Sequence, residues 1–162
     1  MTGSPAPRGW SERLADLGIE LPDVVAPLAA YVPAVRTGNL VYTAGQLPMV
    51  NGQVTVTGKV GSDVTPEVGK TLARLCALNA LAAVDSLVGL DAVTQVVKVV
   101  GFVASAPGFQ GQPSVVNGAS ELLAEVFGDR GAHARSAVGV AEALLNGEAA
   151  GSLRRIQNEL FD

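Results

Sequence analysis

The sequence is poor in the residues that hold metals and disulfides. It has one cysteine and one histidine among 162 residues. Cys76 therefore cannot form an internal disulfide, and its place in an apolar helical pattern predicts a buried free thiol. A Cys/His metal centre needs several ligands at set spacings, and none is present. A Ser-His-Asp triad would have to use His133, and no serine lies in a G-x-S-x-G elbow. We expect neither a metal nor a cofactor.

Basic charge and long apolar runs are also scarce. There are 11 Lys and Arg residues against 15 Asp and Glu, giving a net charge of −4. Nucleic-acid-binding surfaces are normally basic stripes, so a nucleic-acid partner is not expected. The opening "MTGSPAPRGW" has no apolar signal segment, and no run of 18 consecutive apolar residues occurs. The sequence predicts a cytoplasmic protein without a membrane partner.

What the sequence does have is small apolar side chains. Hydrophobic residues make up 48% of the chain but aromatics only 4%, so the core must consist of Val, Leu and Ala. The length suits one domain, residues 1–162. Residues 1–10, rich in Pro, Gly and hydroxyl side chains, are expected to be disordered, and 142–162 form an atypical tail.

Apolar periodicity and turn residues predict the order of elements. The expected elements are a short helix from Ser11, strands at 29–35 and 39–48, a small hairpin around Asn51-Gly52, a helix from the Thr65 cap to Gly89, a strand within 91–105, a helix at 112–128 and a strand at 132–141. Two helices on one face of a single mixed sheet make an α+β sandwich. The long strand is β-branched on both faces, which is typical of a strand covered on both sides. No helix is left for the other face of the sheet, so association is expected.

Arg135 is the charged residue that needs explaining. In the strand "ARSAVGV" it shares a face with Ala137 and Gly139, which leave room for a ligand. A guanidinium suits bidentate carboxylate binding, and Gly45 exposes a backbone N–H that no side chain blocks. Together they would make a site for a small 2-oxo or 2-imino acid. The alternative is a structural arginine that is salt-bridged at the surface.

Two further residues are candidates for the same site. Tyr31 could line the pocket, or it could be an ordinary residue at the core edge. Asn117, in an apolar helix segment, could touch the ligand or cap a backbone group. Glu121, one turn later, is expected to be a solvated helix residue.

Several segments together resemble a known family. They are "AAYVPAV", "TGNLVYTAGQLP", "CALNALAAV", "VVKVVGFVASAPGF", "VVNGASELL" and "GAHARSAVGVA", covering about residues 14–141. In order and spacing they resemble the RidA family of reactive-intermediate imine deaminases, also called YjgF or endoribonuclease L-PSP-like proteins. The motifs "YVPAVRTGN" and "AGQLP" are most similar to one RidA-like subgroup.

The resemblance implies a chorismate-mutase-like fold, assembled as a homotrimer with a central β-barrel and ligand clefts between subunits. It implies cofactor-free hydrolysis of 2-iminopropanoate and 2-iminobutanoate to 2-oxo acids and ammonia. By position, Arg135 corresponds to the carboxylate-binding arginine and Gly45 to the glycine that binds through its backbone. Tyr31 matches the cleft tyrosine, and Asn117 the asparagine of the second helix.

The chain departs from the family pattern in places. Ala44 and Ala137 replace a serine and a frequent cysteine beside the glycine and the arginine. The family's last strand, with its water-positioning glutamate, has no match: the tail reads as an amphipathic helix, and Glu142 and Glu148 are the nearest carboxylates. A positioned base contributes about 10²–10⁴-fold to such a hydrolysis.

Three functions therefore remain open. The first is imine and enamine deamination. The second is binding of small carboxylates, such as 2-oxo acids, with little or no turnover. The third and weakest is the ribonuclease activity of the family's older name.

Overall fold

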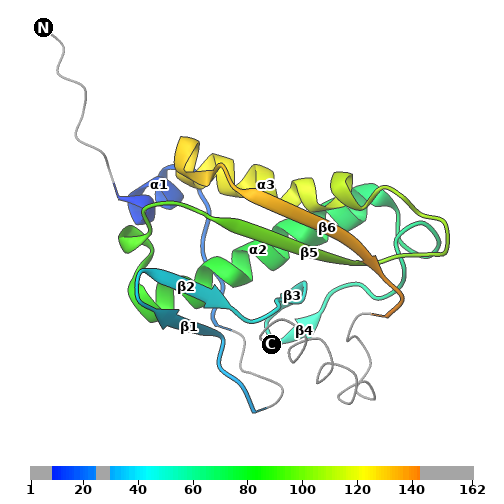
Figure 1. Ribbon diagram of the computed structural model, residues 1–162, viewed down its shortest axis with the longest axis horizontal. Coiled ribbons are helices and arrows are strands. Elements are labelled where there is room, and N and C mark those ends of the chain that lie inside the picture. The colour runs from blue at the N-terminus through cyan, green and yellow to red at the C-terminus, as the bar shows by residue number, and fades with distance from the viewer. Residues whose placement is uncertain (1–8, 25–29, 143–162) are drawn as a thin grey trace, which may run out of the picture.

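A computed structural model describes residues 9–24 and 30–142 of the chain. Figure 1 shows the elements in their order along the sequence. The helices are α1 (Trp10–Asp16), α2 (Pro66–Val88) and α3 (Gln112–Phe127), with short 3-10 turns η1 (Leu90–Ala92) and η2 (Gly128–Gly131). The strands are β1 (Ala34–Thr37), β2 (Leu40–Thr43), β3 (Met49–Val50), β4 (Gln53–Val54), β5 (Lys98–Ala104) and β6 (Ala134–Val140).

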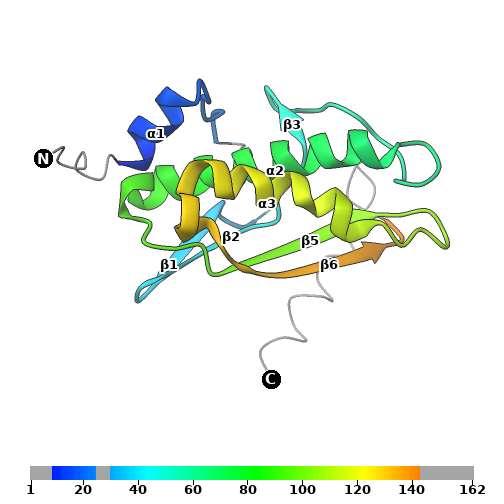
Figure 2. The ribbon, with the colours of Figure 1, turned by 90° about the horizontal axis from the view of Figure 1, so that it is seen from above.

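The elements form two layers. Figure 2 shows β1, β2, β5 and β6 on one side of α2 and α3. The expected α+β architecture, with two helices on one face of the strands, is confirmed. The strands, however, form three separate pairs: β1–β2 and β3–β4 are antiparallel, and β5–β6 is parallel. No ladder joins these pairs within the described ranges. The single mixed sheet expected from the sequence is wrong in this respect, because β1 and β2 have only four residues each and bond to one another.

Both long helices begin and end where their sequences predict. The Thr65 side chain accepts a hydrogen bond from the Val68 N–H, and Pro66 occupies the first turn of α2, where no N–H is needed. Gly89 follows the helix with φ 77°, which favours glycine. Gly128 ends α3 in the same way with φ 55°.

The two helices approach each other closely through one glycine. A Cβ at Gly118 of α3 would collide with the backbone carbonyl oxygen of Lys70 on α2. The buried core is built mostly from Leu, Val and Ala, and Leu90, Leu122, Val126 and the aromatic Phe127 are at 2% exposure or less. A core of this composition was expected from the scarcity of aromatics.

The segment β5–α3–β6 is a parallel βαβ unit. Val99 pairs with Arg135, Gly101 with Ala137 and Val103 with Gly139. These positions face the helices: Val103 is buried, and a Cβ at Gly101 would meet the Val116 side chain of α3. The register thus places Arg135 on the helix-covered side.

The opposite side of the strands is open in the single chain. Val100, Phe102 and Val138 are between 43% and 58% exposed, and Val35, Leu40 and Tyr42 of the β1–β2 hairpin are similarly exposed. This agrees with the expectation that no helix is left for the second face of the long strand. The β-branched pattern is there, but only one face meets a helix.

The N-terminal helix differs from expectation. Trp10, placed by its sequence in a disordered segment, opens α1 because its indole N–H donates to the Val93 carbonyl and its ring packs against Phe127. Ser11 does not cap the helix; Gly9 is the N-cap, and the Ser11 N–H donates to the Asp91 carboxylate. The expected helical tail beyond Glu142, with Glu148, lies outside the described residues.

Helix α2 is long and apolar. Its length and mean hydropathy of 1.4 would suffice for a bilayer-spanning helix. It packs against α3, β1 and β2, however, and carries the buried Asn79. Its composition is that of the core helix of this fold.

Candidate functional site

Arg135 is fixed by two side chains of helix α3. Its Nη1 donates to the Asn117 Oδ1 at 2.7 Å and to the Ser120 Oγ at 3.1 Å. Asn117 and Ser120 are three residues apart, so they lie on the same face of α3, toward β6. The structure thus brings together two of the sequence-predicted residues, Arg135 and Asn117. Asn117 does not cap a backbone group in these contacts; its oxygen accepts from the guanidinium.

The hydrogen-bonded chain continues behind Ser120. The Ser120 Oγ lies 3.0 Å from the His133 Nε2, and the His133 Nδ1 lies 2.6 Å from the Gly131 carbonyl oxygen. Ser120, His133 and Arg135 are all partly buried. We call the four residues Asn117, Ser120, His133 and Arg135 the arginine network.

Arg135 has no carboxylate partner in the described part of the chain. The ion pairs found there join Lys59 to Glu142, Lys70 to Glu121 and Arg74 to Glu125. The described residues therefore do not support the alternative in which Arg135 forms a surface salt bridge. Its Nη1 is occupied by neutral acceptors, which leaves the guanidinium charge available to an anion at its Nη2 and Nε edge. Glu121 is exposed, as expected, and pairs with Lys70.

Gly45 and Tyr31 lie together elsewhere in the chain. The Ala44 N–H, next to Gly45, donates to the Pro33 carbonyl, two residues after Tyr31, at 2.8 Å. Gly45 is exposed, and a Cβ there would meet nothing within 4 Å. Tyr31 is 46% exposed, which does not fit an ordinary core-edge residue. No described contact joins either residue to Arg135.

A buried asparagine holds the loop that follows Gly45. The Asn79 Nδ2 donates to the Leu47 carbonyl at 2.8 Å and to the Met49 carbonyl at 3.2 Å. Its Oδ1 is buried without a partner among the described residues. The sequence analysis did not single out Asn79 for this role.

Sequence reasoning also missed Ser120 and His133 as members of the site. Ser120 follows Asn117 at helical spacing, and His133 precedes Arg135 by two residues, the spacing that repeats a face along a strand. Counting three residues forward from Asn117 and two residues back from Arg135 leads to Ser120 and His133.

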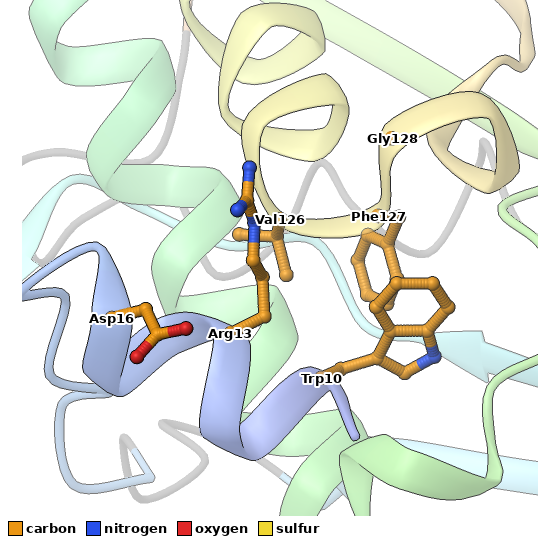
Figure 3. Close-up of a pocket in the computed structure, with 6 residues that line it drawn as sticks. All are labelled: Trp10, Arg13, Asp16, Val126, Phe127 and Gly128. Atoms are coloured by element: carbon orange, nitrogen blue, oxygen red, sulfur yellow. The ribbon is translucent and has the colours of Figure 1, made fainter. Parts of the chain in front are cut away.

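A separate hollow lies at the other end of α3. Figure 3 shows Trp10, Arg13, Asp16, Val126, Phe127 and Gly128 around an open depression of about 400 Å³. The Arg13 side chain reaches across it and donates from Nε to the Glu125 carbonyl. None of the arginine-network residues lines this hollow. We assign it no part in the site.

The Cys76 thiol is a poor nucleophile, and the described residues hold no metal-binding cluster. Burial raises the pKa of the Cys76 thiol to about 12, so the thiolate is scarce at neutral pH. Among the described residues, no group of three or more His, Cys, Asp and Glu side chains could hold a metal ion.

Comparison with known proteins identifies the family. Residues 11–149 match the family model described as "YjgF/chorismate_mutase-like, putative endoribonuclease". The chain belongs to the YjgF family. The match covers most of the described residues, including the whole βαβ unit and the β1–β2 hairpin.

Individual relatives agree with the family match. The chain is 44% identical to Protein TCP17 of Trypanosoma cruzi over 131 residues, 80% of this chain and 82% of that protein. A crystal structure of Atu1372 from Agrobacterium tumefaciens, a protein of unknown function, is 45% identical with a TM-score of 0.75, covering 85% and 84% of the two chains. A "putative endoribonuclease" from Shewanella oneidensis is 33% identical with a TM-score of 0.82, covering 86% and 93%. These likenesses establish the YjgF fold for this chain.

Proposed function

We propose that this YjgF-family protein hydrolyses small 2-imino and 2-enamine acids, such as 2-iminopropanoate and 2-iminobutanoate, to 2-oxo acids and ammonia. The observation that carries the proposal is the geometry of Arg135. A partly buried guanidinium is held by neutral side chains, with no carboxylate partner among the described residues. Such a cation is suited to the carboxylate of a small acid.

The arginine network also sets the direction of that contact. Both hydrogens of the Arg135 Nη1 point to protein acceptors, the oxygens of Asn117 and Ser120. A carboxylate would therefore approach the Nη2 and Nε edge, where two parallel N–H groups can bind its two oxygens.

Ala137 and Gly139, on the same face of β6, do not supply this space. Ala137 packs against the core cluster around Val103, and a Cβ at Gly139 would lie 2.8 Å from the Gln112 Nε2. The expectation that these two small residues leave room for a ligand is therefore wrong.

The open strand face supports a multi-subunit site. Val100, Phe102, Val138 and the exposed residues of the hairpin form an apolar surface that water would otherwise cover. We propose a homotrimer that buries this face in a central barrel. Gly45 and Tyr31, which do not reach Arg135 within one chain, would then serve the arginine network of a neighbouring subunit. A reducing, cytoplasmic setting would keep the single Cys76 thiol free.

A second candidate is binding without turnover. The described carboxylate that comes nearest the family's glutamate in sequence, Glu142, is exposed and paired with Lys59 at 3.1 Å. This favours a protein that holds a 2-oxo acid on Arg135 and catalyses slowly. Ribonuclease activity remains the weakest candidate, because the net charge of −4 gives RNA phosphates little attraction.

The test is release of 2-oxo acid and ammonia from 2-iminopropanoate generated in situ. We expect Arg135→Ala to abolish turnover and pyruvate binding together. Arg74→Ala is the matched control, because it removes an arginine that pairs with Glu125 on the helix layer and should leave both unchanged. Pyruvate binding without turnover in the unmutated protein would favour the second candidate. No binding and no turnover would reject both.

A further inference from the structure

The proposed hydrolysis needs a group that takes a proton from the attacking water. The arginine network contains one side chain with a basic nitrogen that can accept a proton, His133. It lies behind Ser120, which itself touches Arg135. The position is notable because Glu142 is engaged with Lys59.

The direction of each hydrogen bond in the network follows from its atoms. The Gly131 carbonyl oxygen can only accept, so the His133 Nδ1, 2.6 Å away, carries a hydrogen. In the neutral ring the Nε2 then has a lone pair, and the Ser120 hydroxyl, 3.0 Å away, donates to it. The Arg135 Nη1 donates to the same Ser120 oxygen at 3.1 Å.

This arrangement leaves the Ser120 oxygen ready for a water molecule. Its hydrogen points to His133, and one of its two lone pairs accepts from Arg135. The second lone pair can accept from a water on the Nη1 side of the guanidinium, next to the Nη2 and Nε edge where we propose that the substrate carboxylate is held. The Arg135 charge also stabilises negative charge that develops on that hydroxyl.

We propose that Ser120 and His133 form a proton relay that activates the attacking water; the proposal rests on the imine hydrolysis proposed above. Ser120 is the catalytic residue, since it touches the water, and His133 is a positioning residue that acts through it. The relay occupies the role for which the resemblance implies a glutamate.

Every proton and bond is accounted for in the reaction that the relay would serve. Water forms a C–O bond to the carbon of the protonated imine, the C=N π electrons move to nitrogen, and the water proton passes to Ser120 as the Ser120 proton passes to the His133 Nε2. His133 then returns its proton through Ser120 to the amine nitrogen. The C–N bond breaks, its electrons leave with ammonia, and the hydroxyl O–H electrons form the C=O bond. Ammonia takes that last proton, so the products are the 2-oxo acid and ammonium.

A purely structural role makes a different prediction. If Ser120 and His133 only orient Arg135, removing them weakens substrate binding, and any residue that keeps the hydrogen bond restores function. If they relay protons, kcat falls while carboxylate affinity holds. Glutamine separates the two roles, because its amide oxygen can accept from Ser120 but does not take up the proton.

The experiment measures kcat and KM for 2-iminopropanoate, with pyruvate affinity by calorimetry, in the full chain. We expect Ser120→Ala, His133→Ala and His133→Gln each to lower kcat about 10²-fold or more while pyruvate affinity changes less than about threefold. Ser120→Thr, which keeps the hydroxyl, should retain most of kcat, and added imidazole should restore His133→Ala but not Ser120→Ala. Ser114→Ala, on an exposed turn of the same helix, is the control.

The outcomes distinguish the two proposals. Turnover by the unmutated protein that persists in Ser120→Ala and His133→Gln would overturn the relay alone. Full activity of His133→Gln with loss in His133→Ala would also overturn it, in favour of positioning. No turnover by the unmutated protein would overturn the relay together with the deaminase proposal. Thermal unfolding of each variant, followed by circular dichroism, identifies any loss that comes from misfolding.

Discussion

The two faces of the β5–β6 pair differ in what they contact. On the helix side, Val103 is 6% exposed and Gly101 lies against Val116 of α3. On the other side, the adjacent residue Phe102 is 58% exposed, although its side chain is large and apolar. Lys98 and Ser136, hydrogen-bonded at 2.9 Å, are the polar residues of this open face.

The difference shows that the two faces serve different purposes. The helix side holds the chain together and carries the arginine network. The open side contributes little to the stability of one chain, since its side chains remain in water. Its apolar character is better explained by contact with other copies of the chain.

The largest effect is expected at the helix contact behind the covered face. Gly118→Ala places a methyl group against the Lys70 backbone carbonyl, which cannot move without shifting α2. We expect the free energy of unfolding to fall by more than about 3 kcal/mol, measured by urea denaturation. Gly45→Ala is the control, because its Cβ meets nothing within 4 Å and its stability should change by less than about 0.5 kcal/mol. Wild-type stability in Gly118→Ala would show that the helices can separate.

A charge on the open face should leave the chain folded but prevent assembly. Phe102→Glu puts a carboxylate where we propose that three chains meet, and a buried unpaired charge is costly. Sedimentation velocity should show the wild type at about three times the 16.4 kDa chain mass and the variant at one chain. Ser114→Glu, which adds the same charge on α3, should remain assembled. A wild type that sediments as a single chain would contradict the trimer.

A smaller loss is expected when the loop after Gly45 is released from α2. Asn79→Leu removes both hydrogen bonds to the Leu47 and Met49 carbonyls and leaves these groups unpaired. It also removes the buried, unpartnered Oδ1, which offsets part of the cost. We expect a net loss of about 1–2 kcal/mol in urea denaturation and faster amide exchange at Gly45. Gln95→Leu, a substitution at an exposed position, is the control. Equal stability of the two variants would show that the Asn79 hydrogen bonds do not stabilise the loop after Gly45.

The smallest effect concerns the start of the long helix. Thr65→Ala removes the side-chain acceptor for the Val68 N–H. We expect a loss of about 1 kcal/mol in unfolding free energy, with no change in assembly. Thr57→Ala, in an exposed loop, is the control and should show no such loss. If the unfolding free energy of Thr65→Ala equals that of the wild type within error, water caps the helix equally well.

The sequence predicts elements well where local chemistry decides them. Thr65, Pro66 and Gly89 mark the ends of α2, and Asn51-Gly52 marks the β3–β4 turn, because caps and positive φ angles depend on the residue itself. The joining of strands into a sheet depends on partners distant in sequence, so the separate pairs were not predicted. The open face of the strands was predicted, because counting helices showed that none was left to cover it; the apolar pattern alone does not tell what covers such a face.

The site was predictable in part. Arg135 and Asn117 could be singled out because a charge in an apolar strand and an amide in an apolar helix are conspicuous. Ser120 and His133 were missed because serine is common on helices and His133 lies just before the strand. The spacings from Asn117 and Arg135 place both residues on the right faces, but whether their side chains meet depends on how α3 packs over β6.

The connectivity of the arginine network has a consequence for folding. Its hydrogen bonds join residues 13, 15 and 18 positions apart, whereas the Asn79 bonds to the Gly45 loop span 30 and 32. Contacts that are near in sequence close smaller loops and form sooner. We therefore expect α3 and the start of β6 to form the arginine network early, with the loop that follows Gly45 docking on α2 later.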